Sequence, residues 1–162
     1  MIDRRTLIAG AALGLAGCSG RASTYSGPEV TRIQVFKASR TLQLIHDRQL
    51  LKQYQMQLGF APLGHKEKEG DGRTPEGAYY INRKNPRSAY HLSLGISYPS
   101  ISDVARARAA GVDPGGDIFI HGTPQAFSSQ KDWTWGCIAV TNAEMEEIYP
   151  MVKEGTKIFI YA

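Results

Sequence analysis

The sequence has few of the residues that metal centres and nucleotide-binding loops require. It contains two cysteines and four histidines, and the histidines at positions 46, 65, 91 and 121 show no close ligand spacing. No glycine-containing stretch has the form of a phosphate-binding or dinucleotide-binding loop. The chain also has no run of five Lys or Arg residues, so a formal net charge of +4 is weak support for nucleic-acid binding. We therefore expect no metal ion, no cofactor and no nucleic-acid partner.

Length and composition favour one globular domain. The chain has 162 residues, of which 42% are hydrophobic and 21% are charged, close to the averages of globular proteins. A single domain usually has ~100–200 residues, which leaves almost no room for a second one. We expect one hydrophobic core and a monomer.

Residues 1–17 have the composition of an export signal. Arg4 and Arg5 precede an apolar run of small residues that is too short to cross ~30 Å of hydrocarbon. The run ends in Leu15-Ala16-Gly17-Cys18, which resembles a bacterial lipobox, in which the cysteine is acylated and becomes the new N-terminus. An ordinary signal peptide with a chance cysteine is the alternative. The Arg4-Arg5 pair also resembles a twin-arginine signal, so the export route stays open.

The polar residues 18–29 read as a tether between a lipidated Cys18 and a domain at 30–162. Ser19 does not resemble an inner-membrane retention signal. These features predict a periplasmic lipoprotein anchored to a membrane, with the outer membrane favoured.

Hydrophobic periodicity predicts a strand-rich domain. Apolar and polar residues alternate over 31–36, 41–45 and 50–58. Further short strands are expected at 77–81, 90–94, 117–120, 137–140 and 157–161, and short helices at 101–110 and 141–152. The second helix opens on Thr141-Asn142-Ala143-Glu144, a capping-box pattern. The predicted class is mainly β with short helices, either a β-sandwich or a curled sheet with one helix against it.

The residues best suited to chemistry are His121 and Cys137. If Cys18 carries lipid, Cys137 has no partner in the chain, and a free thiol is either buried and inert or kept for its reactivity. A thiolate attacks acyl carbons well, and an imidazole in reach can take its proton and later return one. Gly136, which lacks a Cβ, would let a substrate carbonyl approach backbone N–H groups that form an oxyanion hole. A structural histidine and a buried cysteine remain the alternative.

Four segments, residues 70–79, 91–99, 118–122 and 134–142, follow one another in a fixed order along the chain. Together they resemble the L,D-transpeptidase catalytic domain, the YkuD-type family of peptidoglycan enzymes. The resemblance implies a mixed β-sandwich and a reaction that proceeds through a thioester on cysteine. In that reaction the cysteine attacks the carbonyl between an L-centre and the terminal D-residue of a stem tetrapeptide, and an amine resolves the thioester.

Carried onto this chain, the resemblance makes Cys137 the nucleophile, His121 the general base and the backbone around Gly136 the oxyanion hole. The family pattern has Ser/Thr-His-Gly-Cys and an Arg two residues after the cysteine. This chain has Trp135 in place of that histidine and Ala139 in place of that arginine. The familiar cation for a substrate carboxylate is therefore missing from its usual position.

Other residues are candidates for substrate binding. His91 falls in one matching segment, Arg73 in another, and Trp135 flanks the nucleophile, as does Trp133. Arg73 and Lys66 could meet anionic carboxylates. Each has an ordinary structural alternative: a hydrogen-bonded histidine, loop packing for the tryptophans, and solvated loop charge for the two cations.

The predicted function is that of a cysteine L,D-transpeptidase acting on peptidoglycan stem peptides in cell-wall biogenesis and cell shape. Two alternatives stay open. One is a hydrolase, an L,D-carboxypeptidase or amidase, since water and an amine compete for one thioester. The other is a catalytically silent peptidoglycan-binding lipoprotein.

Overall fold

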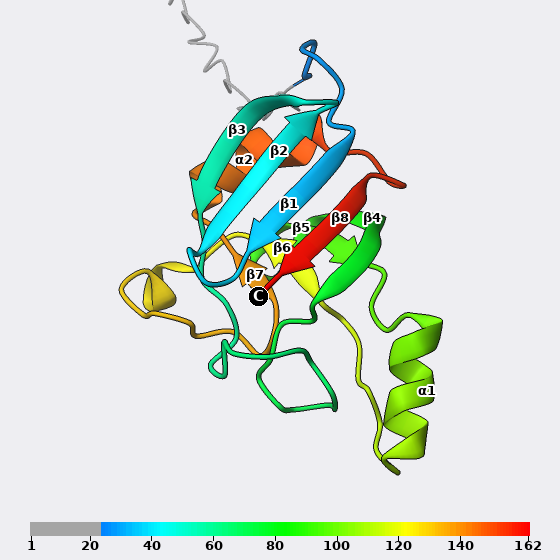
Figure 1. The fold of residues 1–162 in the computed structure, drawn as a ribbon. Coiled ribbons are helices and arrows are strands. Elements are labelled where there is room, and N and C mark those ends of the chain that lie inside the picture. The colour runs from blue at the N-terminus through cyan, green and yellow to red at the C-terminus, as the bar shows by residue number, and fades with distance from the viewer. Residues whose placement is uncertain (1–23) are drawn as a thin grey trace, which may run out of the picture.

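A computed structural model describes residues 24–162 of the chain (Figure 1). The predicted signal peptide at 1–17 and the predicted lipidation of Cys18 lie outside these residues. The described part of the predicted tether, 24–29, contains no helix or strand. Within the described chain, neither length nor hydropathy qualifies any helix as a membrane span.

The core of the fold is one mixed sheet of eight strands. Their order in the sheet is β3-β2-β1-β8-β4-β5-β6-β7. Two neighbouring pairs, β1 with β8 and β6 with β7, are parallel, and the other pairs are antiparallel. The strands are β1 (Arg32–Phe36), β2 (Thr41–His46), β3 (Gln49–Gln55), β4 (Gly77–Ser88), β5 (His91–Ile96), β6 (Phe119–His121), β7 (Ile138–Ala139) and β8 (Lys157–Tyr161).

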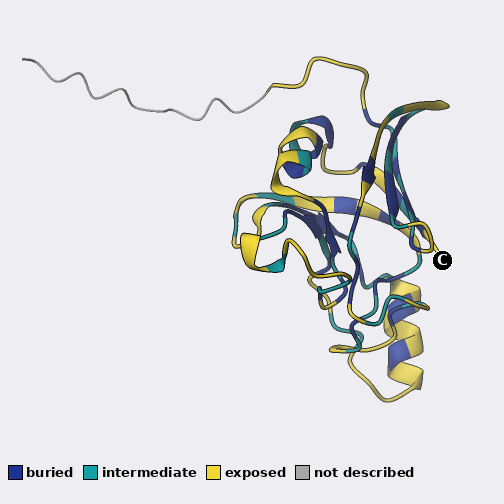
Figure 2. Ribbon diagram, turned by 90° about the vertical axis from the view of Figure 1, so that its left-hand side faces the viewer, coloured by how far each residue is buried: buried dark blue, intermediate teal, exposed yellow. Residues whose placement is uncertain are grey.

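The long strand β4 bends the sheet into two layers. Its first residues, Gly77 to Tyr80, pair with β8, and from Ile81 onward it pairs with β5. Irregular register after Ile81 and again after Asn85 lets the strand turn out of the first layer. The two layers, β3-β2-β1-β8 in front and β5-β6-β7 behind, are visible in Figures 1 and 2. The prediction of a mainly β, mixed and curled sheet is confirmed.

The helix α2 (Asn142–Met151) closes the core. Thr141 and Glu144 cap its first turn reciprocally, as the sequence predicts, and the helix buries Met145, Ile148 and Met151. It packs against β5, and Figure 2 shows its buried face turned toward the sheet. The largest fully buried side chains come from both layers and from α2: Ile33, Leu42, Leu44, Met56, Leu58, Ile81, Leu94, Ile120, Ile138, Met145, Ile148 and Ile158.

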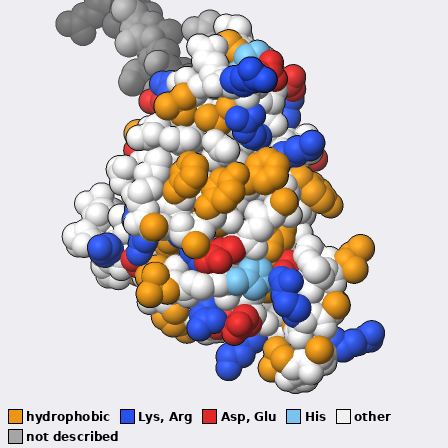
Figure 3. All heavy atoms as spheres, viewed as in Figure 1, with side chains coloured by type: hydrophobic (Ala, Val, Ile, Leu, Met, Phe, Trp, Pro, Cys, Tyr) orange, Lys and Arg blue, Asp and Glu red, His pale blue; other side chains and the backbone are white. Residues whose placement is uncertain are grey.

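The predicted first helix is α1 (Ile101–Ala109), capped by Ser100 and Asp103. It stands to one side of the sheet (Figure 1). The outer face of β1, β8 and β4 carries a band of hydrophobic side chains (Figure 3), among them Tyr80 and the stacked pair Phe36 and Tyr161.

The third strand is shorter than its sequence pattern predicts. Alternation continues to Leu58, but β3 ends at Gln55. The Met56 N–H then bonds the Arg40 carbonyl, and Gln57 forms a bridge with Ala139 of β7. The segment after Gln55 therefore leaves β2 and crosses to the layer that contains β7, where the same alternation buries Met56 and Leu58.

Candidate active site

His121 ends β6, Cys137 directly precedes the adjacent parallel strand β7, and the register places both on the same face of the sheet. In the register of β6 and β7, His121 pairs with Ala139. Side chains alternate along a strand, so Cys137, two residues before Ala139, faces the same side as His121. Neighbouring strands lie ~4.8 Å apart and two residues span ~6.6 Å along a strand, so side chains in these two positions can reach each other. The topology thus brings together the two residues that the sequence nominated.

The hydrogen bonds of His121 define which ring nitrogen can act as a base. Nδ1 lies 2.7 Å from the Gly122 carbonyl oxygen, an acceptor, so Nδ1 carries the proton and donates it. Nε2 then has the lone pair. The side chain is 3% exposed, and burial lowers its pKa below the ordinary value, more than the bond to Gly122 raises it. At neutral pH the ring is an uncharged acceptor.

Two aromatic side chains contact the imidazole, and a third supports one of them. The ring of Tyr90 lies 4.7 Å from that of His121, and the ring of Trp133 lies 5.7 Å from it. Phe127 stacks on Trp133 at 4.3 Å, nearly parallel. These contacts exclude water from one side of His121 and fix its ring plane. Of the two tryptophans near Cys137, Trp133 is thus the one that contacts His121.

Cys137 is a neutral thiol in the resting protein. Burial raises the pKa of the thiol to about 11, and the bond that Sγ accepts from the Phe119 N–H only partly offsets burial. The thiol donates to the Asp117 carbonyl oxygen at 3.5 Å. An uncharged thiol beside an uncharged imidazole requires proton transfer during attack, so the geometry suits general-base chemistry rather than a preformed ion pair.

A tight turn presents the nucleophile. The buried Thr134 donates through Oγ1 to the Cys137 carbonyl at 2.7 Å and accepts from the Gly136 N–H at 3.2 Å. Gly136 has a φ of 122°, and a Cβ there would lie 2.6 Å from the Arg73 carbonyl oxygen. Because the Gly136 N–H is occupied, the Cys137 N–H, which has no acceptor among residues 24–162, is the better candidate for an oxyanion hole.

Polar contacts from the front layer hold the loop before this turn. Arg40 forms a two-pronged ion pair with Asp132, at 3.0 and 2.7 Å, and the Leu58 N–H donates to the same carboxylate. Burial alone would raise the pKa of Asp132, but the bonds from Arg40 and Leu58 outweigh it and lower the pKa. The loop before Cys137 is thus tied to the turn between β1 and β2 and to the segment after β3.

The other predicted site residues are more dispersed. His91 is exposed and pairs through Nε2 with Glu146 of α2 at 2.9 Å, while its neighbour Tyr90 makes the contact with His121. Trp135 is 71% exposed and meets Phe60 edge-on.

The two predicted cations occupy the loop next to the turn. The backbone of Arg73 lies against Gly136, and its guanidinium pairs with Glu67 at 3.1 Å. Lys66 is 3% exposed and pairs with Asp71 at 2.9 Å. The interpretation of Lys66 as a solvated charge or as a contact for substrate carboxylates is wrong, because its ammonium is buried and pairs with Asp71 within the loop.

A cleft of about 370 Å³ borders the position that holds arginine in the family pattern. It lies between the loop around Phe127, the segment after β3 and the start of α2, and Ala139 forms part of its floor. Glu144 lines it, and none of its described lining residues is Lys or Arg. Because Ala139 stands where the family pattern has an arginine, the described lining of this cleft beside Cys137 contains no cation.

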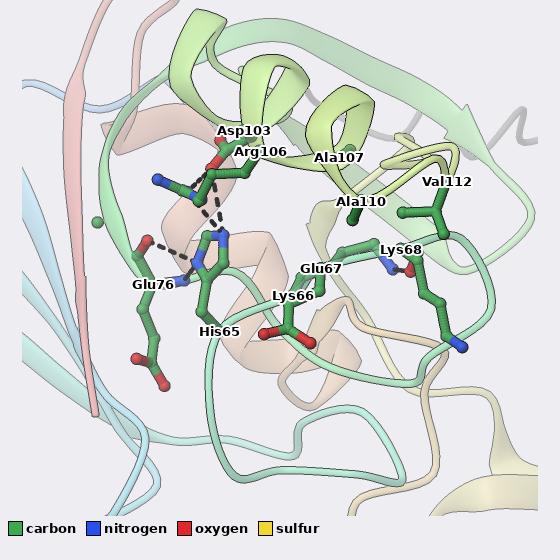
Figure 4. A pocket seen from close by; sticks show the side chains of 11 residues that line it. His65, Lys66, Glu67, Lys68, Glu76, Asp103, Arg106, Ala107, Ala110 and Val112 are labelled. Carbon is green, nitrogen blue, oxygen red and sulfur yellow. Dashed lines mark hydrogen bonds and ion pairs between the residues drawn. The ribbon is translucent and has the colours of Figure 1, made fainter.

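A larger cavity of about 830 Å³ lies beneath α1 and does not include His121 or Cys137 (Figure 4). Within it, His65 Nε2 lies 3.1 Å from Asp103 and 3.0 Å from Arg106, and His65 Nδ1 bonds to the backbone of Glu76. These contacts join α1 to the loop before β4. In the described chain no three His, Cys, Asp or Glu side chains are grouped so as to hold a metal ion.

Sequence reasoning missed several residues of the site. Tyr90, Phe127 and Thr134 act through tertiary contacts that no local pattern reveals. The sequence contained one indication of two of them: Tyr90 directly precedes a segment that resembles the family, and Thr134 is the first residue of another such segment.

Comparison with known proteins shows the family of the chain. Residues 30–160 match the YkuD family, the L,D-transpeptidase catalytic domain. The YafK protein of Escherichia coli (strain K12), named as a candidate L,D-transpeptidase, is 34% identical over 126 residues, which cover 74% of this chain and 46% of YafK. Pgp2 from Campylobacter jejuni, described as a helical cell shape determining protein, has a crystal structure that matches with a TM-score of 0.66 and 26% identity, over 84% of this chain and 49% of that one.

A more distant match shows the fold alone. An L,D-transpeptidase from Mycobacterium smegmatis has a TM-score of 0.56 at 14% identity, over 82% of this chain and 59% of that one. The chain spans about half the length of YafK and Pgp2. The family match includes both His121 and Cys137 and extends over most of the sequence, as the four segments predicted. The chain belongs to the L,D-transpeptidase catalytic domain (YkuD) family.

Proposed function

We propose that the protein is a cysteine acyltransferase that forms a thioester between Cys137 and a peptidoglycan stem peptide. The observation that carries the proposal is the shared face of β6 and β7, on which a buried His121 with a free Nε2 neighbours the only cysteine of the described chain. Sγ attacks the acyl carbon as Nε2 takes its proton, and the leaving amine then takes that proton from the imidazole. The Cys137 N–H faces the oxygen on which charge develops.

The acylation step is tested by intact-mass analysis of the purified protein with a carbapenem, an acylating agent for active-site thiols. We expect the wild-type protein to gain the mass of one inhibitor and Cys137→Ala to gain none. No adduct on the wild-type protein would contradict the proposed chemistry. An adduct that persists in Cys137→Ala would place the nucleophile elsewhere.

The second half of the reaction separates a transpeptidase from a hydrolase. An amine acceptor yields a new cross-link and water yields a shortened stem, so muropeptides released from treated sacculi differ in mass between the two. We propose transpeptidation, because the aromatic enclosure of His121 by Tyr90 and Trp133 limits the access of water. Unchanged muropeptides together with sacculus binding by Cys137→Ala would instead identify a silent binding protein.

We further propose that the protein works in the periplasm, held to the outer membrane by lipid on Cys18. The lipobox-like Leu15-Ala16-Gly17-Cys18 sequence supports this location. Replacing Cys18 by Ser should move the protein from the membrane fraction to the soluble periplasmic fraction. Equal membrane association of both forms would refute the anchor.

A further inference from the structure

The side chain of Arg83 crosses the sheet toward the nucleophile. Arg83 on β4 pairs with Gly95 on β5, and Gly95 pairs with Phe119 on β6. Gly95 has no side chain in the way: a Cβ there would lie 2.6 Å from Arg83 Cγ. The guanidinium carbon consequently reaches a point 4.6 Å from the centroid of the Phe119 ring.

Phe119, under the guanidinium, lies level with Cys137, the residue before β7. Phe119 precedes His121 by two residues, so it shares the face of His121, and the register of β6 and β7 aligns it with Cys137. The guanidinium over Phe119 therefore lies on the face of the sheet that Cys137 shares.

Asp117 connects the two groups. Its carbonyl oxygen accepts from Cys137 Sγ at 3.5 Å, while its carboxylate Oδ1 lies 2.6 Å from Arg83 Nη2. One residue thus touches both the nucleophile and the cation, which sets Arg83 at the rim of the nucleophile's site.

Arg83 keeps the capacity to bind an anion. A guanidinium has five N–H donors, and the carboxylate of Asp117 contacts Nη2. The side chain is 51% exposed, and stacking on Phe119 holds its plane. A stacked, oriented guanidinium with free donors suits bidentate binding of a carboxylate.

The opposite side of the nucleophile lacks such a group. The cleft at Ala139 has no Lys or Arg among its described lining residues and carries the carboxylate of Glu144. An anionic group of the substrate is therefore favoured on the Arg83 side and disfavoured on the Ala139 side.

We propose that Arg83 binds the C-terminal carboxylate of the residue that follows the scissile carbonyl, in place of the arginine missing at position 139. One residue advances an extended chain by ~3.3–3.6 Å, and Asp117 contacts both Sγ and the guanidinium, so with the scissile carbonyl at Sγ the carboxylate of the next residue can extend toward Arg83. The inference rests on the proposed function, because it assumes a stem peptide as the acyl donor. It makes Arg83 a specificity-determining residue of the donor site.

The test measures binding in a protein that cannot react. Cys137→Ala is titrated by calorimetry with a synthetic stem tetrapeptide ending in D-alanine and with the same peptide as its C-terminal carboxamide. We expect the free acid to bind more tightly. Adding Arg83→Gln should weaken binding of the acid by about 10–100-fold, the usual range for a hydrogen bond to a charged group, and leave the carboxamide unchanged.

Two further variants sharpen the result. Arg87→Gln removes the same charge from an exposed position on the same strand and should bind both peptides as Cys137→Ala does. Arg83→Lys keeps the charge without the bidentate fork and should recover only part of the affinity for the acid.

Equal affinity for the acid and the carboxamide, an equal loss for both in Arg83→Gln, or no binding of either would overturn the assignment. The readout needs no thioester, so it separates the two proposals. If Arg83 discriminates between the acid and the carboxamide but no carbapenem adduct forms, only the proposed enzymatic function is refuted. If the adduct forms but the two peptides bind alike, only the proposed role of Arg83 is refuted.

Discussion

Replacing His121 by Gln should slow carbapenem acylation of Cys137 by about 10²–10⁴-fold at neutral pH. The reason is the resting state of the pair. The thiol, with a pKa raised to about 11 by burial, is almost fully protonated at pH 7. The wild-type protein can use Nε2 of His121 to take that proton during attack, whereas a glutamine side chain has no basic nitrogen.

The pH dependence distinguishes this mechanism from a general loss of structure. Burial lowers the pKa of His121 below the ordinary ~6.5, so its neutral, active form prevails above that value. The wild-type rate should be flat there and fall as acid protonates the ring. In His121→Gln the rate should follow the thiolate and rise about tenfold per pH unit toward pH 11.

The measurement is the rate of adduct formation from pH 5 to 10, followed by mass spectrometry of samples quenched at set times. His46→Gln makes the same replacement at a partly exposed histidine on β2 and should keep the wild-type profile. A His121→Gln protein with a flat profile and a wild-type rate would show that another group takes the proton.

Replacing Gly136 by Ala should lower the acylation rate by on the order of 10²-fold, the cost of displacing a reacting group by ~1 Å. Two effects combine at this position. A φ of 122° is a conformation that residues with a Cβ adopt only with strain, and the new methyl group would lie 2.6 Å from the Arg73 carbonyl oxygen. Because that oxygen belongs to the backbone, the nucleophile turn must move.

The matched control is Gly111→Ala, after α1. Gly111 also has a positive φ, 68°, but a Cβ added there would have no other atom within 4 Å. Strain alone should lower its unfolding free energy by about 1 kcal/mol and leave acylation intact. Thermal unfolding and acylation rates are compared for both variants. If Gly136→Ala behaved like Gly111→Ala in both assays, close packing against Arg73 would have no part in catalysis.

Several elements were predictable because their causes are local. The strands β1 and β8 each bury alternate residues on one face, which period-two patterning records directly. The capping box Thr141/Glu144 involves atoms within one helical turn. The end of β3 was not predictable in this way, because alternation continues unbroken while the chain exchanges one partner strand for another.

The same distinction applies to the site. His121 and Cys137 could be named from residue type and from the family resemblance. The protonation state of the pair could not, because it depends on burial by aromatic residues from other segments. The different contacts of two neighbouring residues likewise depend on the tertiary structure. At the start of β5, the Tyr90 side chain turns toward His121, whereas the His91 side chain turns toward Glu146 of α2.

Local pattern alone was thus enough to predict the strand-rich architecture and the helix caps, and residue type with the family resemblance was enough to nominate His121 and Cys137. Long-range pairing was needed to align β6 with β7, to lay Arg83 over Gly95 beside the nucleophile, and to bury the thiol and imidazole so that both rest uncharged. The physical reason is that burial and cross-strand contact are properties of residues far apart along the chain. Their free energies arise only when the sheet closes.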